Sequence, residues 1–142
     1  MRVRTLVPVL VAAALVLPAC ADVSKEKEET PEPAELVAIE GSDRSAIIVE
    51  PEAVDRVGIE TGTVTSGGSG RTTMPAAAVF YGLEGETWTY TNPEENTYVR
   101  TPIVVDDIQG DTAFVSDGPK PGTRVVTVGA PELFGVEEGV GH

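Results

Sequence analysis

Thr87-Trp88-Thr89-Tyr90-Thr91 carries the strongest structural signal in this chain. Aromatic and hydroxyl side chains alternate there with the two-residue period of a half-buried strand. Asn92-Pro93-Glu94-Glu95-Asn96 is a cluster of turn residues, and Thr97-Tyr98-Val99-Arg100 resumes the alternation. The pattern therefore predicts a β-hairpin that places Trp88 and Tyr90 on one face.

Further short β-rich runs lie on both sides of this hairpin, separated by Gly, Pro or Asp. They are Ser45–Val49, Ile59–Thr65, Ala77–Tyr81, Ile103–Val105, Thr112–Ser116 and Thr123–Val128. Closely spaced short strands with almost no helical periodicity are typical of a small antiparallel β-barrel or sandwich. We predict an all-β module over residues 45–134, with one short helix at Pro51–Gly58 and a single helical turn at Pro131–Phe134.

Several local expectations accompany this fold. Val54 and Val57 should face the body from the short helix, and the fully apolar Ile103–Val105 should be an inner strand. Asp106–Asp111 should be a turn. Ser66–Gly70 reads as a flexible joint, either a loop within one domain or a hinge between two, and one body is preferred because few residues precede it.

Composition excludes several classes of function. The formal net charge is −13, which argues against nucleic acid as a partner and against the module lying flat on anionic lipid. One cysteine excludes an internal disulfide, and one cysteine with one histidine disfavours a zinc site. No phosphate-binding glycine loop and no nucleophile set stands out, so no catalytic residue, cofactor or metal ligand is predicted and the chain is not expected to be an enzyme.

The first residues have the features of a secretory signal. Met1–Arg4 is basic, Thr5–Leu17 is mostly aliphatic, and the chain turns polar at Asp22. The alternative, a permanent transmembrane helix, is disfavoured because the apolar run is shorter than the ~20 residues of a membrane span and because Pro18 interrupts its end. Residues 1–19 are therefore predicted to be a signal peptide.

Leu17-Pro18-Ala19-Cys20 resembles the lipobox of bacterial lipoproteins. The resemblance implies that Cys20 is acylated and becomes the new N-terminus on the extracytoplasmic face of the cell membrane. The alternative is cleavage after Ala19 that leaves a free thiol, which is a liability in an oxidising compartment. Two acyl chains, each burying methylene groups at ~0.8 kcal/mol apiece, would hold the protein stably on a bilayer.

Residues 20–44 are predicted to be an acidic disordered tether. Lys25–Pro33 has high charge, two prolines and no apolar periodicity, so it buries too little surface to offset the entropy of ordering. Its Glu cluster could alternatively bind a cation, but a solvated linker is favoured in the absence of a Gly turn. Residues 135–142, ending in His142, are predicted to be a flexible tail in which a metal role for the lone histidine is not favoured.

Three segments resemble the C-terminal modules of periplasmic adaptor (membrane fusion) subunits of efflux systems. They are Ile48–Thr61, Met74–Val79 followed by Thr87–Tyr90, and Gly118–Ala130. The resemblance spans about Ile47 to Phe134 and implies a β-barrel followed by a membrane-proximal domain. It also implies an integral membrane transporter as partner.

The chain departs from that family in two ways. It has no room for the lipoyl-like domain and long helical hairpin of those adaptors, so the resemblance does not imply bridging of two membranes. In addition, Glu50 stands where the family often has a Thr that caps the short helix.

Two groups of side chains have competing interpretations. Trp88 and Tyr90 could form an aromatic patch that contacts a partner, or they could fill the core, which is favoured because the chain has few aromatic residues. A set of acidic residues could bind a cation or serve as turn residues, and turn chemistry is favoured. This set is Asp106, Asp107, Asp111 and Asp117.

Two functions remain as hypotheses. The first is a lipid-anchored, non-enzymatic accessory module that docks on a membrane transporter. The second is a surface lipoprotein that captures a small molecule or a metal ion. Cys20 is the residue to which the sequence assigns a role most directly, that of lipid attachment.

Overall fold

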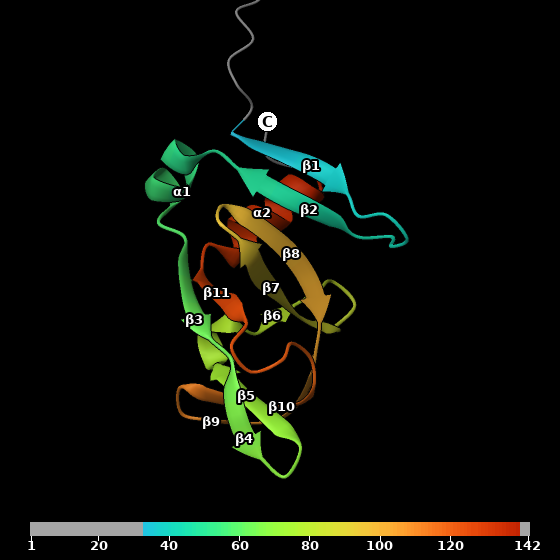
Figure 1. Ribbon diagram of the computed structural model, residues 1–142, viewed down its shortest axis with the longest axis vertical. Helices are drawn as coiled ribbons and strands as arrows, with labels where there is room; N and C mark the ends of the chain where they lie inside the picture. Colours follow the sequence, from blue (N-terminus) through green and yellow to red (C-terminus); the bar gives the residue numbers. More distant parts are fainter. Residues whose placement is uncertain (1–32, 140–142) are drawn as a thin grey trace, which may run out of the picture. The chain divides into compact units, whose positions relative to one another are not determined.

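Two antiparallel sheets form most of the part of the chain that the computed structural model describes, residues 33–139 (Figure 1). The seven-stranded sheet has the order β1 (Ala34–Ala38), β2 (Ser45–Val49), β8 (Thr97–Pro102), β7 (Thr87–Glu94), β11 (Arg124–Val128) and β3 (Glu60–Thr63), and β6 (Phe80–Tyr81) also pairs with β7. The four-stranded sheet has the order β4 (Thr65–Gly68), β5 (Arg71–Pro75), β10 (Thr112–Asp117) and β9 (Val104–Gln109). The predicted signal peptide, Cys20, most of the tether and His142 lie outside the described residues.

Three short helices connect or end these strands: α1 (Pro51–Val57), the 3-10 turn η1 (Ala76–Ala78) and α2 (Ala130–Glu137). Pro51 occupies the first turn of α1, and Gly58 ends it in the left-handed region with φ 73°, as the sequence predicts. The all-β class is confirmed, with two short α-helices where one was expected.

The predicted hairpin is present as β7 and β8, with Trp88 opposite Pro102 and Tyr90 opposite Arg100. β7 runs further than expected, because its register shifts between Thr91 and Glu94 rather than ending in a turn. Asn92 explains the shift. Its side-chain amide is buried and donates to Glu94 O at 2.6 Å and to Thr97 O at 2.9 Å, which satisfies the carbonyls that the irregular ladder leaves free.

Two hydrophobic clusters form the core. The first joins the inner face of the seven-stranded sheet to α2 through Ile47, Val49, Ala53, Tyr90, Tyr98, Val126 and Leu133. The second joins residues of both sheets through Val64, Met74, Ala78, Ile103, Ala113, Val115 and Val125. Alternation of buried and exposed positions along each strand is what lets such short strands contribute to a core.

The predictions of a disordered tether at residues 20–44 and a flexible tail at residues 135–142 are both partly wrong. Within the predicted tether, residues 34–38 form β1, because Ala34-Glu35-Leu36-Val37-Ala38 pairs in full with β2. Within the predicted tail, α2 continues through Glu137, because the helix packs its Leu133 side against the sheet. In each case tertiary pairing orders a segment whose local composition favours disorder.

The predicted flexible joint at Ser66–Gly70 is also wrong. Thr65–Gly68 forms β4, which pairs with β5 around a tight turn in which Ser69 and Gly70 have positive φ values of 53° and 78°. Two successive positive φ angles are what a two-residue hairpin turn requires. Small residues here serve turn geometry rather than flexibility.

Three further local expectations are corrected. Residues 77–81 are not one strand, because η1 comes first and β6 has only two residues. The apolar run Ile103–Val105 leads into the edge strand β9, which replaces the predicted turn at 106–109 and leaves Val104 exposed. In α1, Val54 packs against the core beside the buried Ala53, as predicted, whereas Val57 is exposed because it lies at the end of the helix.

Candidate functional site

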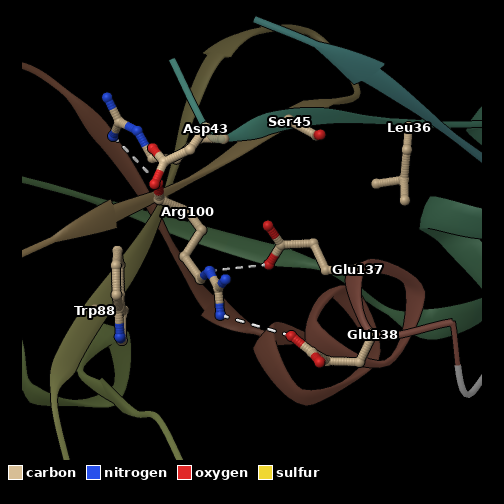
Figure 2. A pocket seen from close by; sticks show the side chains of 8 residues that line it. Leu36, Asp43, Ser45, Trp88, Arg100, Glu137 and Glu138 are labelled. Carbon is tan, nitrogen blue, oxygen red and sulfur yellow. Dashed lines mark hydrogen bonds and ion pairs between the residues drawn. The ribbon is translucent and has the colours of Figure 1, made fainter.

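A pocket of about 250 Å3 lies between the β1–β2 hairpin, the strands β7 and β8, and the C-terminal end of α2 (Figure 2). Its walls bring together residues that are far apart in the sequence. They are Leu36, Asp43, Arg44, Ser45, Trp88, Arg100, Glu137 and Glu138. The pocket therefore contains charges of both signs beside an indole ring.

Arg100 is the central residue of this pocket. It lies on β8 opposite Tyr90, so its side chain points to the face of the sheet that α2 covers. The guanidinium carbon lies 4.8 Å from the ring centroid of Trp88 and 5.7 Å from that of Phe134. A cation over an aromatic face is stabilised by the ring quadrupole, and most strongly over Trp.

Two carboxylates at the C-terminal end of α2 balance the charge of Arg100: Glu137, the last residue of the helix, and Glu138, which follows it, as Figure 2 shows. Arg100 Nε lies 3.2 Å from Glu137 Oε2, and its Nη1 lies 4.0 Å from Glu138 Oε1. Nε is buried and makes no hydrogen bond of good geometry within the described residues, so charge rather than hydrogen bonding holds the contact with Glu137. Glu137 is the better buried of the two acids and lies closer to the guanidinium, so removal of Arg100 would leave the charge of Glu137 less solvated than that of Glu138.

Tyr90 is the third residue of the network around Arg100 and contacts Glu137. Its hydroxyl donates to Glu137 Oε2 at 2.7 Å, so one carboxylate oxygen is shared by the phenol and the guanidinium. Burial, together with the hydrogen bond to Glu137 and the negative charge of that residue, raises the pKa of the Tyr90 phenol far above its usual range. Tyr90 therefore stays protonated at neutral pH and donates a hydrogen bond to the Glu137 carboxylate.

The rim of the pocket is built by the β1–β2 turn. Arg44 Nη1 donates to Arg100 O at 3.3 Å, and Ser42 Oγ accepts from Arg44 N–H at 3.1 Å. These contacts hold the turn over the sheet. Within residues 33–139, no group of three His, Cys, Asp or Glu side chains is placed to hold a metal ion.

The two aromatic candidates have different environments. Tyr90 is fully buried, which confirms the favoured core interpretation and removes it as a partner contact. Trp88 is half-buried beneath Arg100, on the same face of the sheet as Tyr90, as predicted. Trp88 thus lines the pocket instead of forming an exposed patch.

Two of the acidic residues that the sequence predicts as turn residues, Asp106 and Asp107, accept hydrogen bonds from nearby residues. Asp106 Oδ1 accepts from Ser116 Oγ at 2.7 Å, and Asp107 accepts from the Ile108 N–H at 2.9 Å and from Gln109 Nε2 at 2.7 Å. These contacts hold the edge strand and its neighbour. The prediction of turn residues is thus correct for Asp111 and wrong for Asp106 and Asp107, which lie in β9, and for Asp117, which ends β10.

Sequence reasoning missed Arg100 and its two acidic partners. One signal was present: alternation places Arg100 on the same side of its strand as Tyr98, so a charged residue occurs where the pattern expects an inward-facing one. An inward arginine needs a buried partner. That partner could not be found, because Glu137 falls in the segment predicted to be a tail.

A second feature is the end of β6 and the turn that follows it, where Tyr81 of β6 and Leu83 of the turn present their side chains to solvent. Tyr81 is 60% exposed and Leu83 is 86% exposed. The Gly82 N–H donates to Glu86 O at 2.8 Å, and the Glu84 N–H donates to Glu86 Oε2 at 3.1 Å. The backbone N–H of Glu86, with smaller contributions from Trp88 and Glu84, lowers the pKa of the Glu86 carboxyl. The turn is thus closed by a charged carboxylate.

Comparison of the chain with protein-family models, with curated proteins and with solved structures found no match. None of the helices within residues 33–139 is long and apolar enough to cross a bilayer.

Proposed function

We propose that this protein is a lipid-anchored, non-enzymatic accessory module that docks on an integral membrane transporter at the extracytoplasmic face of a bacterial cell membrane. The observation that carries the docking part of the proposal is the ordered turn that holds Tyr81 and Leu83 in solvent. The lipobox-like sequence at Cys20 and the resemblance to efflux adaptors support the location and the kind of partner.

The turn has the properties of a contact site. Contiguous exposed apolar patches mark interaction sites, and Tyr is among the side chains that dominate interface energies. Because the turn is closed by its own hydrogen bonds, little conformational entropy is lost when a partner covers it. A flexible loop with the same side chains would bind more weakly.

Site-specific photocrosslinking in intact cells tests this proposal. A photoreactive amino acid at position 83 should crosslink to an integral membrane protein, identified by mass spectrometry of the adduct. The matched control is position 52, which is exposed on α1, and which should give no such adduct. If position 83 yields no membrane-protein adduct, or the same adducts as position 52, the turn is not a docking site.

The pocket beside Arg100 favours a second candidate function, capture of a small polar molecule. Its volume and its mixed charges would suit a ligand that carries both a cationic and an anionic group. Native mass spectrometry of the protein purified without chelator would show an added mass if a ligand is held. Substitution Arg100→Met should remove that mass, and an empty wild-type protein would contradict this function.

A further inference from the structure

The outer edge of β1 differs from the other edges of the two sheets. The sheets end at β1, β3, β4 and β9. The pairings of β3, β4 and β9 with their neighbours all contain register shifts, and irregular pairing of this kind discourages a further strand from joining. β1 pairs with β2 through five residues without a shift. Of the four strands at which the sheets end in the described residues, β1 is thus the one whose pairing contains no register shift to discourage a further strand.

The hydrogen bonds at both ends of β1 show which backbone groups face outward. The Glu50 N–H donates to Pro33 O at 3.0 Å, and the Ile39 N–H donates to Arg44 O at 3.1 Å. Hydrogen-bonded pairs alternate along an antiparallel ladder, so the odd-numbered residues from 33 to 39 face β2. The N–H and C=O groups of Ala34, Leu36 and Ala38 therefore lie on the free edge.

This edge is complementary to itself. If β1 of a second chain runs antiparallel to β1, with a two-fold axis at Leu36, Leu36 lies opposite Leu36 and Ala34 lies opposite Ala38. All three outward-facing residues then pair with outward-facing residues. Each N–H on the free edge of β1 would then donate to a C=O of the other chain. A centre at Glu35 would pair only Ala34 with Leu36 within β1 and would place the two Glu35 side chains opposite each other, and a centre at Val37 would pair only Leu36 with Ala38, so Leu36 is the centre that uses all three outward-facing residues of β1. We propose that β1 pairs with β1 of a second copy of this chain, which joins two seven-stranded sheets edge to edge.

The side chains fit the same register. Leu36, which is 45% exposed, would pack against its symmetry mate, and the small Ala34 and Ala38 flank it. Glu35 would lie opposite Val37 of the other copy and not opposite another Glu35, which avoids a direct like-charge pair. The net charge of −13 opposes association at long range, so added salt should strengthen the pairing.

Cysteine crosslinking of the full chain in its own membrane tests the pairing. Opposed residues of a hydrogen-bonded antiparallel pair have Cα atoms ~5.5 Å apart, which a disulfide can span. Leu36→Cys should therefore form a covalent homodimer on mild oxidation. Wild type, which keeps Cys20, sets the background, and Glu35→Cys is the matched control, because each Glu35 faces Val37 of the other copy.

A mixed experiment tests the register. Differently tagged chains carrying Glu35→Cys and Val37→Cys should crosslink to each other more strongly than either does to itself. Leu36→Pro removes an outward-facing N–H that bonds no described residue. It should abolish the crosslink between Glu35→Cys and Val37→Cys chains and should change the thermal unfolding midpoint of the protein little. A Leu36→Cys dimer yield no higher than that of Glu35→Cys, or a Leu36→Cys adduct with a different protein, would overturn self-pairing. The outcome is independent of the Leu83 crosslink.

Discussion

At the level of single residues, Arg100 organises the pocket and also supports the fold. Its guanidinium covers Trp88 and Phe134, and its charge balances a carboxylate that is largely buried. Removal of one partner of such a pair leaves the other charge uncompensated, which destabilises a protein more than the pair itself stabilises it. The shape and charge of this pocket and the stability of the contact between the sheet and α2 therefore depend on the same side chain.

Arg100→Met should lower the free energy of unfolding by about 2 to 4 kcal/mol, because Glu137 loses its counter-ion. Glu138→Ala, which removes a more exposed acid at 4.0 Å, should change it by less than about 0.5 kcal/mol. Urea unfolding followed by the fluorescence of Trp88, the single tryptophan, measures both. Equal effects of the two substitutions would contradict the larger contribution assigned to the pair between Arg100 and Glu137.

Tyr90 makes the stability depend on alkaline pH. The unfolded phenol loses its proton near pH 10, whereas in the folded protein its pKa is raised by burial and by Glu137. The contribution is fully present below about pH 10 and is lost as the pH rises further, because only the unfolded state releases the proton. Tyr90→Phe should cost about 1 kcal/mol at neutral pH and should flatten this alkaline decline. Parallel stability curves for the two proteins would contradict the assignment.

At the level of elements, α2 depends on how the chain enters it. Gly129 precedes the helix with φ 96°, and a Cβ placed there would lie 2.8 Å from Ile59. Only glycine adopts this conformation without strain, and at this position it also allows close packing against the segment before β3. The position of Glu137 in the pocket thus depends on a glycine at the opposite end of its helix.

Gly129→Ala should therefore destabilise the protein by about 2 to 4 kcal/mol, from backbone strain plus the clash with Ile59. Gly122→Ala is the matched control, since Gly122 has a φ of 92° but open space around its Cβ position, and it should cost only about 1 to 2 kcal/mol. Chemical denaturation of both variants provides the comparison. An equal loss in the two would mean that the contact with Ile59 relaxes freely.

At the level of the complete chain, attachment and docking are separate parts of the proposal. Cys20→Ala should move the protein from the membrane fraction to the soluble fraction, because Cys20 is the only cysteine in the sequence and the proposed acyl chains would have no other thiol for attachment. Fractionation followed by immunoblotting measures this. Retention on the membrane in the absence of Cys20 would show that another contact, such as docking, is sufficient to hold the protein there.

Local patterns in the residue order were enough to predict the all-β class, the Trp88 hairpin, the short helix ended by Gly58 and the inward direction of Tyr90. These features follow from two-residue alternation, turn residues and capping, all of which act between near neighbours. Tertiary contacts were needed for β1, for the length of α2 and for the pairing of Arg100 with Glu137. Those features join segments that are individually polar or short, and such segments become ordered only when a distant partner satisfies their hydrogen bonds and charges.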